Sequence, residues 1–420
     1  MSTCKDYLSR SQAGFTPRTA MEEAARCLLC HDAPCSKGCP AGTDPAKFVR
    51  SIRFRNVKGA AETIRENNVL GGICAAVCPY DRLCEQACSR CGIDRPIEIG
   101  RLQRFAIEQE KLYGMKTLRR GAETGKKVAC IGAGPASLAA AAELARSGYA
   151  VTIYEAREKA GGWLTYGITP VRLPQEVVDY DISKITELGV TIMCGTAVGR
   201  DISFEQLRKD YDAIFVGIGL SCAKLPQLPG IVLDGVYGGV DFLSKARSSG
   251  GTFYPGRRVV VIGGGDVAMD CASTAQLLGA EKTAIWYRRS LKEAPADAAE
   301  IAYVTSLGVG ITTDMAPVAI EGDGRVERIR FCGRDGESEA CVACDTVVFA
   351  VGQTHGEAGV AALAANEKGL LCAADGRTSL AGVYAAGDIV NGGKTVVEAV
   401  AAGKRAAQQI IADLTERTGE

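Results

Sequence analysis

The segment KKVACIGAGPASLAAAAELARSGYAVTIYE occupies residues 126–155 and has the pattern of a strand, a glycine-rich turn, a helix and a second strand. Gly132 and Gly134 follow the expected strand 127–131, and Ser137, in place of a third glycine, is small enough to keep helix and strand close. This order places backbone amides and a helix N-terminus against a pyrophosphate. Glu155, at the end of the second strand, is correctly spaced to accept hydrogen bonds from a ribose hydroxyl. The segment therefore predicts a dinucleotide-binding fold.

A second glycine fingerprint predicts a second dinucleotide-binding fold. Gly263-Gly-Gly265-Asp-Val-Ala268 follows the apolar run 259–262 and precedes a helix of small residues. From Lys126 onward, strand and helix patterns alternate, which is typical of α/β folds. The expected strands are Val128–Ile131, Val151–Tyr154, Ala213–Val216, Val259–Ile262, Ala284–Tyr287 and Thr346–Ala350.

Two further segments indicate a flavin at the first fingerprint. Gly161-Gly162-Trp163 follows it, as in flavin disulfide-reductase-like folds, and a late strand from Val383 runs into Gly387-Asp388. In flavoproteins of this shape, such an aspartate hydrogen-bonds the ribityl chain, and the neighbouring helix N-terminus faces the isoalloxazine ring. We therefore expect FAD here. The residues expected to bind it are Val77, Gly132, Ala133, Gly134, Pro135, Ala136, Glu155, Gly161, Gly162, Trp163, Arg172, Val198, Gly387, Asp388, Thr395 and Val396.

The second fingerprint is expected to bind a nicotinamide dinucleotide. After its next strand come Arg288 and Arg289, where an NAD-selective site would usually place an acidic residue. Two guanidiniums there could pair with the 2′-phosphate of NADPH, although they could instead form a solvated loop. We expect NADPH, with NADH as the alternative. The residues expected to bind it are Gly263, Gly264, Gly265, Asp266, Val267, Arg288, Arg289, Lys292, Ala350, Val351 and Gly352.

The length and composition of the chain make some classes of function less plausible than others. At 420 residues and 47% hydrophobic, the chain is long enough for two or three domains. Its 49 basic and 49 acidic residues cancel, which favours neither nucleic acid nor an anionic membrane as a partner. The N-terminus lacks the apolar core of a secretion signal, and no stretch has the length of a membrane span, so we expect a soluble cytoplasmic protein. Only two histidines are present, which leaves little for histidine acid–base chemistry.

Ten of the 18 cysteines lie between Cys4 and Cys91. In this region we expect short helices, one that starts at Thr16-Pro17 and others at 46–55 and 60–67. Disulfides are not expected in the cytoplasm, so metal or cluster ligation is favoured. Cys27, Cys30, Cys35 and Cys39, followed by Pro40, are close to the bacterial ferredoxin run, in which the last cysteine serves a second cluster. The second run is Cys74, Cys78, Cys84 and Cys88. A pair of zinc sites is the alternative, in which case the chain would be a zinc-stabilised, dinucleotide-sensing scaffold. Cys4 and Cys91 are interpreted as spare thiols.

Four segments carry a family resemblance: RCLLCHDAPCSKGCP (26–40), GAAETIRENN (59–68), GGICAAVCPYDRLCEQAC (71–88) and PIEIGRLQRF (96–105). They closely resemble the N-terminal part of dihydropyrimidine dehydrogenase, and nearly the whole chain resembles the separate flavin subunit of the bacterial two-subunit enzyme. In that family two [4Fe-4S] clusters have crossed ligation. The resemblance implies that Cys27, Cys30, Cys35 and Cys88 hold the first cluster, that Cys39, Cys78, Cys84 and Gln103 hold the second, and that Cys74 has no ligand role.

The resemblance also implies a function. The chain would oxidise NAD(P)H at FAD and pass electrons through both clusters to a partner subunit, a barrel that holds FMN and iron–sulfur clusters and reduces uracil or thymine. Bacterial subunits of this family are often linked to NADH, whereas Arg288 and Arg289 favour NADPH, and we follow the residues. The small subunit of glutamate synthase, or a related NAD(P)H:acceptor oxidoreductase, is the nearest alternative because it shares the fold, the FAD and the first cysteine run.

The expected architecture is an N-terminal helical iron–sulfur domain followed by two Rossmann-like domains of the flavin disulfide-reductase-like type. The cluster domain would span 1–121, the FAD domain 126–219 and 353–420, and the NAD(P)H domain 220–352. Cys341 and Cys344 form a C-x2-C pair that could suggest a redox dithiol, as in thioredoxin reductase. The pair leads into a strand, where residues three apart point to opposite faces, so we expect ordinary packing instead.

Overall fold

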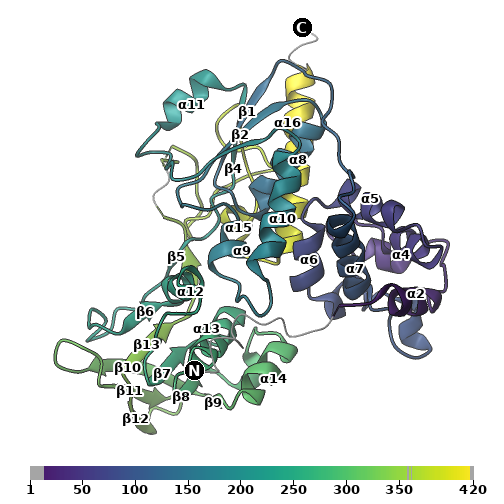
Figure 1. The fold of residues 1–420 in the computed structure, drawn as a ribbon. Helices are drawn as coiled ribbons and strands as arrows, with labels where there is room; N and C mark the ends of the chain where they lie inside the picture. Colours follow the sequence, from purple (N-terminus) through teal and green to yellow (C-terminus); the bar gives the residue numbers. More distant parts are fainter. Residues whose placement is uncertain (1–13, 357–358, 361, 417–420) are drawn as a thin grey trace. The chain divides into compact units, whose positions relative to one another are not determined.

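The computed structural model describes residues 14–356, 359–360 and 362–416 (Figure 1). The described chain divides into two compact units. The smaller unit consists of Tyr166–Pro174 and Ser221–Gly356, and the larger unit contains the described residues of Gln12–Thr165, Gln175–Leu220 and Glu357–Glu420. No helix in the described ranges combines the length and the apolarity that a bilayer crossing requires.

The first part of the larger unit is helical, as the sequence predicts. The Thr16 side chain caps the first helix by accepting a hydrogen bond from the Thr19 amide, and Pro17 occupies the first helical position, where its missing N–H costs nothing. Asp44 and Asn56 cap two later helices in the same way. The elements are α2 (Pro17–Ala25), α3 (Pro34–Lys37), α4 (Pro45–Arg53), α5 (Val57–Asn67), α6 (Gly71–Val77) and α7 (Ile99–Leu112), with 3-10 turns η1 (Tyr80–Arg82) and η2 (Ser89–Gly92).

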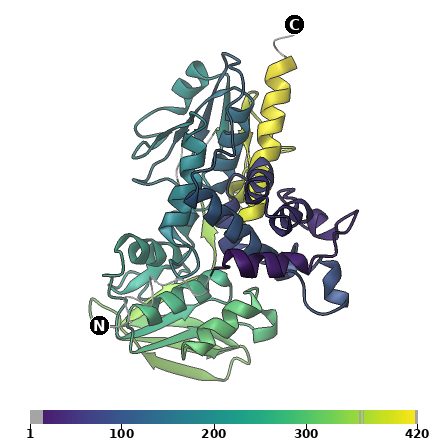
Figure 2. The ribbon, with the colours of Figure 1, turned by 45° about the vertical axis from the view of Figure 1, so that its right-hand side comes forward.

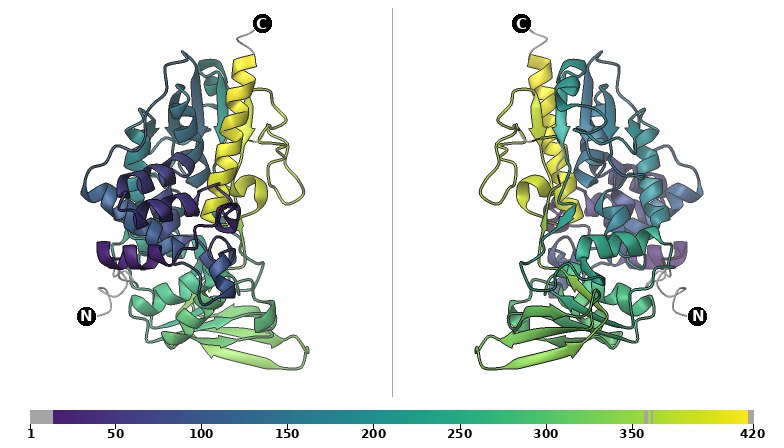
Figure 3. Two further views of the ribbon diagram at one scale, coloured as in Figure 1. Left: turned by 90° about the vertical axis from the view of Figure 1, so that its right-hand side faces the viewer. Right: turned by 90° about the vertical axis from the view of Figure 1, so that its left-hand side faces the viewer.

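A parallel five-stranded sheet forms the rest of the larger unit, in the order β15-β4-β1-β2-β3. The strands are β1 (Lys127–Ile131), β2 (Ala150–Tyr154), β3 (Thr191–Met193), β4 (Ala213–Val216) and β15 (Val383–Ala385). The helices are α8 (Pro135–Arg146), α9 (Trp163–Tyr166, which ends in the smaller unit), α10 (Gln175–Thr186), α11 (Phe204–Asp210), α15 (Asp388–Asn391) and α16 (Val396–Glu416). The long α16, yellow in Figure 3, packs along α8.

The smaller unit has a second parallel sheet, β6-β13-β7-β8-β9, drawn in green in Figure 2. Its strands are β6 (Val236–Gly238), β7 (Arg258–Ile262), β8 (Lys282–Trp286), β9 (Gly310–Thr312) and β13 (Thr346–Phe349). Its helices are α12 (Gly239–Ser248), α13 (Asp266–Leu277), η3 (Leu291–Glu293) and α14 (Ala298–Ser306). An antiparallel sheet of β10 (Met315–Glu321), β11 (Arg328–Gly333) and β12 (Glu339–Ala343) and a ribbon of β5 (Cys222–Ala223) and β14 (Gln353–Thr354) complete it.

All six strands expected from the sequence are present, with small differences at their ends. β8 stops at Trp286 and β13 at Phe349, so Tyr287 and Ala350 lie just outside their strands. The antiparallel sheet β10–β12 was not among the expected strands. Its Phe331 stacks on Trp286 of the parallel sheet with ring centroids 4.0 Å apart, which joins the two sheets through one core.

Candidate cofactor sites

The four cysteines expected to hold the first cluster line one pocket. Cys27, Cys30 and Cys35 come from the segment around α3, and Cys88 reaches the same pocket from a distant part of the sequence. Burial raises the pKa of Cys35 to about 11, and the neighbouring Cys88 and Cys27 thiols raise it further. Burial is also the main cause of the raised pKa of Cys27. A bound metal would reverse this preference by stabilising the thiolates, so the donor set fits a cluster.

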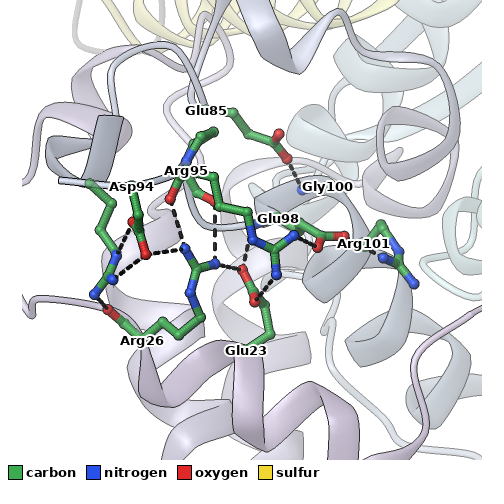
Figure 4. Close-up of polar contacts among 10 residues, drawn as sticks. Glu23, Arg26, Glu85, Asp94, Arg95, Glu98, Gly100 and Arg101 are labelled. Atoms are coloured by element: carbon green, nitrogen blue, oxygen red, sulfur yellow. Dashed lines mark hydrogen bonds and ion pairs between the residues drawn. The ribbon is translucent and has the colours of Figure 1, made fainter. Parts of the chain in front are cut away.

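An ion-pair network holds the loop that follows Cys88 (Figure 4). The Arg26 guanidinium lies 3.1 Å from a carboxylate oxygen of Asp94, and Arg90 donates to the other oxygen of Asp94 at 2.8 Å. The hydrogen bonds from Arg90 and Arg26 hold the pKa of Asp94 well below its usual range. On the other side of Arg26, the buried Glu23 carboxylate accepts from Arg26 at 2.5 Å and from the Glu98 amide at 3.0 Å. The network ties the loop to both α2 and α7.

The cysteines expected for the second cluster also influence one another. Cys78 ends α6, and its pKa is raised first by a hydrogen bond with the Cys74 side chain, then by burial and by the charges of Cys74, Cys84 and Cys39. Burial, Glu85 and Cys39 raise the pKa of Cys84 to about 12. Cys39, Cys78 and Cys84 are therefore close enough to interact electrostatically. In the described ranges, no three His, Cys, Asp or Glu side chains are arranged to hold a single metal ion.

Gln103 lies on α7 and is almost completely buried, with 8% of its surface exposed. Its Nε2 donates a hydrogen bond of 2.7 Å to the Gly71 carbonyl at the start of α6. Because that carbonyl can only accept, the contact assigns the amide nitrogen to this side and leaves Oε1 as the free acceptor. An amide oxygen that accepts no other hydrogen bond is available as an iron ligand, which is the role that the family resemblance implies for Gln103.

The first glycine fingerprint has a geometry suited to a pyrophosphate. Gly132 has φ +86°, and a Cβ there would lie 2.9 Å from the Gly217 carbonyl oxygen, so the turn needs glycine. Gly134 caps α8 without a side chain, and a Cβ on Gly162 would lie 3.0 Å from the Gly134 Cα. Gly132 and Gly134 remain partly exposed at the N-terminus of α8, where an anion is favoured.

Glu155 is buried and faces this turn. One carboxylate oxygen accepts from the Ala133 amide at 2.7 Å, and the other accepts from the Arg157 amide at 2.9 Å. Each oxygen keeps a second lone pair, so both can still accept hydrogen bonds from a ribose. The structure therefore places the expected acidic residue beside the expected glycine turn.

Asp388 begins the short helix α15, directly after Gly387. Burial raises the pKa of Asp388, and the hydrogen bond from the Lys394 amide, 3.2 Å long, opposes this shift. A Cβ on Gly387 would lie 2.9 Å from the Cβ of Ala136 on α8, so the late strand and the first fingerprint are in close contact. The remaining residues expected at FAD in the larger unit occupy the end of α6, the turn around Gly161, a buried loop and the start of α16: Val77, Trp163, Val198, Thr395 and Val396.

Arg172 was expected at FAD, and the structure places it in the smaller unit. Its guanidinium lies 3.0 Å from Asp270 on α13 and 3.2 Å from Glu300 on α14. Burial lowers the pKa of Arg172, but the charges of Asp270 and Glu300 outweigh burial and raise it overall. The ion pairs hold the segment 166–174 beside the helix of the second fingerprint.

The second fingerprint repeats the close packing of the first. Gly263 has φ +152°, and a Cβ there would lie 2.5 Å from the Ala350 carbonyl oxygen. Gly265 caps α13, and the Asp266 carboxylate accepts from the Asp297 amide at 2.8 Å. The β13 end, with Ala350, Val351 and Gly352, lies at the same edge of the sheet. These residues meet at the carboxyl ends of parallel strands, where dinucleotides bind in folds of this type.

Arg288 and Arg289 follow β8 and are both exposed. In the part of the chain that the structure describes, neither guanidinium has a hydrogen-bond or ion-pair partner. The nearby Glu293 is engaged elsewhere, since its carboxylate accepts from Ser290 and lies 3.2 Å from Arg334. Lys292, in η3, is exposed as well. This edge of the smaller unit therefore presents uncompensated positive charge.

Sequence reasoning missed several charged groups around these sites. The network of Glu23, Arg26 and Asp94 joins residues far apart in the sequence, and so do the pairs of Arg172 with Asp270 and Glu300. Cys341 and Cys344 are both free thiols, one exposed and one buried, as the expected opposite faces require. Cys91 is exposed and Cys74 is buried, while Cys4 lies outside the described residues.

Two family models match the chain. The model "dihydropyrimidine dehydrogenase domain II, 4Fe-4S cluster" covers residues 4–115, and "pyridine nucleotide-disulphide oxidoreductase" covers residues 126–403, more than half of the chain. Among solved structures, FprA of Mycobacterium tuberculosis in complex with NADPH has a TM-score of 0.61 at 18% identity, over 70% of this chain and 86% of FprA. Thioredoxin reductase of T. acidophilum has a TM-score of 0.56 at 21% identity, over 69% and 99% of the two chains. At these identities the likeness shows the fold, which confirms the expected fold class.

The curated relatives are more similar. The NAD-dependent dihydropyrimidine dehydrogenase subunit PreT is 46% identical in both Salmonella typhimurium and Escherichia coli K12, over 97% of this chain and 97% of each relative. The small chain of glutamate synthase [NADPH] of Escherichia coli K12 is 32% identical over 94% of this chain and 92% of the relative. The resemblance seen in the sequence is thus confirmed: the chain is an oxidoreductase that belongs to the family of the NAD-dependent dihydropyrimidine dehydrogenase subunit PreT.

Proposed function

We propose that this chain is the electron-input subunit of a dihydropyrimidine dehydrogenase, which oxidises NAD(P)H and delivers the electrons to a partner subunit that reduces uracil or thymine. The observation that carries the proposal is the pocket shared by Cys27, Cys30, Cys35 and Cys88. Three cysteines of the first run meet the last cysteine of the second run there, which is the crossed arrangement that the family resemblance implies. A chain with both glycine folds and this cysteine arrangement has the parts for hydride uptake and for one-electron transfer.

The proposed cofactor sites follow the domain division inferred from the sequence. The segment 1–121 would hold two [4Fe-4S] clusters, with Cys39, Cys78, Cys84 and Gln103 as ligands of the second. The segments 126–219 and 353–420 would hold FAD, and the segment 220–352 would hold the nicotinamide dinucleotide. When bound, FAD would supply the conversion between a two-electron hydride and the single electrons that clusters accept.

The residues of the chain position these groups. Glu155, held by the amides of Ala133 and Arg157, presents its remaining lone pairs to a ribose. Asp388 has one oxygen bound to the Lys394 amide, and its other oxygen has no partner among the described residues, so it is available to a ribityl hydroxyl. The amides at the N-terminus of α8 would hold the pyrophosphate. No residue has to transfer a proton for hydride transfer itself.

We further propose that NADPH is the preferred donor. The PreT relatives are named as NAD-dependent, so this proposal departs from their name. It is supported by the exposed and unpartnered guanidiniums of Arg288 and Arg289 directly after β8, the place where the adenosine ribose lies in folds of this type. A 2′-phosphate would give both arginines charge-assisted hydrogen bonds that NADH cannot offer.

The proposed partner is the barrel subunit that holds FMN and iron–sulfur clusters. The relatives are named as subunits, so members of this family act in assemblies. The described residues of this chain form a helical region and two dinucleotide folds, and no barrel occurs among them. We also infer a cytoplasmic location, because the proposed cluster ligands must stay free of disulfides and that compartment keeps thiols reduced.

The test measures dihydropyrimidine formation and dye reduction with purified proteins. We expect the isolated chain to reduce artificial one-electron or quinone-like dyes with NAD(P)H and to leave uracil and thymine unchanged. Adding the barrel subunit should start pyrimidine reduction without altering the dye activity. Rapid uracil reduction by this chain alone would refute the division of labour, and productive coupling to a glutamine-dependent synthase would instead support the function named for the relative that is 32% identical.

A further inference from the structure

Lys404 links the long helix α16 to the cysteine-bearing segment. Its Nζ donates hydrogen bonds to two backbone carbonyls, that of Ala41 at 2.9 Å and that of Asn67 at 2.5 Å. Ala41 follows Cys39 by two residues, so their Cα atoms are at most about 7 to 8 Å apart. The Lys404 ammonium group, on a helix of the first dinucleotide fold, is therefore held beside the backbone that carries Cys39, an expected ligand of the second cluster.

The charge of Lys404 is not cancelled by a direct ion pair. Within residues 14–356, 359–360 and 362–416, no carboxylate lies within ion-pair distance of its Nζ. Among acidic groups, Glu143 on α8 has the largest effect on the pKa of Lys404, and its carboxylate lies 3.4 Å from the Arg146 guanidinium. Burial lowers the pKa of Lys404 and Arg146 adds to this, while the charges of Glu143 and Cys39 oppose it. Cys39 and Lys404 thus interact across the boundary between helical region and sheet.

We propose that Lys404 raises the reduction potential of the second cluster by placing a positive charge beside its Cys39 ligand. The proposal rests on the ligand set given under the proposed function. Reduction adds one negative charge to a cluster, and a fixed cation nearby stabilises the reduced form more than the oxidised form. Lys404 is thereby a positioning residue that makes the second cluster a better electron acceptor, without touching the cluster itself.

Three variants separate the charge from the hydrogen bonds. Lys404→Gln removes the charge and retains an amide that can donate to the same carbonyls, and Lys404→Arg retains the charge. Arg405→Gln is the matched control, because it removes one positive charge from the next residue of α16, whose side chain is exposed. The readout is the midpoint potential in an EPR-monitored redox titration of the anaerobic full-length chain. The signal that is missing in Gln103→Ala identifies the second cluster.

We expect Lys404→Gln to lower the ratio of reduced to oxidised second cluster at a fixed potential by roughly threefold to tenfold. For a one-electron couple a tenfold change corresponds to about 59 mV. Lys404→Arg should stay near the wild type, and the first cluster should be unaffected. An unchanged midpoint in Lys404→Gln, or an equal shift in Arg405→Gln, would overturn the role of Lys404 alone, provided that iron and sulfide are present in full. A chain without acid-labile sulfide would instead overturn the cluster assignment and, with it, this proposal.

Discussion

Replacing Arg65 by methionine should destabilise the helical region severely. Arg65 lies on α5 with no exposed side-chain surface, between two equally buried carboxylates. Its guanidinium is 2.8 Å from Glu110 on α7 and 2.7 Å from Asp181 on α10. Asp181 also accepts from the Ile73 amide at 2.8 Å, in the first turn of α6, the helix that ends at Cys78. The triad therefore holds the cysteine-bearing helix against the first dinucleotide fold.

The expected loss of stability arises because the two carboxylates stay buried without their cationic partner. Removing one member of a buried ion pair typically costs about 3–5 kcal/mol, because the remaining charge has lost its compensation. Arg65→Met keeps most of the side-chain volume, so the decrease in the free energy of unfolding reflects the uncompensated charges rather than a cavity. The control is Arg18→Gln, which breaks the exposed pair with Glu22 and should leave the free energy of unfolding nearly unchanged. Denaturant unfolding gives both free energies. EPR spectra, with Gln103→Ala as the reference that lacks the second cluster, should show the second cluster depleted before the first.

The effect of Arg65→Met should depend on pH. Burial raises the pKa of Asp181, and Arg65 opposes that shift, so the substitution should raise this pKa further. A carboxyl group whose pKa is higher in the folded state binds more protons there, and stability then falls as pH rises through that range. The penalty of Arg65→Met should thus shrink on going from pH 8 to pH 5.5. A penalty below about 1 kcal/mol, or one independent of pH, would refute the reasoning.

Two further predictions concern the cofactors. Anaerobically purified protein should contain about eight irons per chain, and Gln103→Ala should reduce this to about four while FAD remains; stoichiometric zinc without acid-labile sulfide would contradict the ligand assignment. Arg288→Glu should lower the efficiency of flavin reduction by NADPH roughly 10- to 100-fold and reverse the donor preference, because a carboxylate would face the 2′-phosphate. Stopped-flow reduction with both donors measures this, with Arg257→Gln as a control at an exposed pair with Glu281, and a wild-type preference for NADH would exclude the phosphate role.

The parallel sheets were predictable, whereas the antiparallel sheet was not. After one basic residue, strands β1 and β7 are apolar, and a glycine directly follows each of them. Such local patterns can be recognised from the sequence without knowledge of the tertiary contacts. Strand β12 alternates exposed and half-buried residues and has no fully buried side chain, so its pairing with β11 decides its conformation.

The candidate sites divide in the same way. The two glycine turns and Glu155 could be located from spacing, because each turn lies within one βαβ unit and Glu155 ends the second strand of the first unit. The meeting of Cys88 with Cys27 depends on tertiary packing, and only the family resemblance indicated it. The partners of Arg65 and Lys404 lie far from them in the sequence, and no periodicity relates them.

The shared pocket of Cys27, Cys30, Cys35 and Cys88 has a consequence for the maturation of the protein. Synthesis proceeds from the N-terminus, so the first three cysteines leave the ribosome well before Cys88. A nascent chain that has exposed only the first run holds no complete site, and premature iron would meet thiols in the wrong combination. With the proposed ligand assignment, loading of iron and sulfide would await emergence of the second run and closure of its loop onto α2 by Arg26 and Asp94. Because this pocket combines cysteines of both runs, its assembly would follow the order in which the two runs are synthesised.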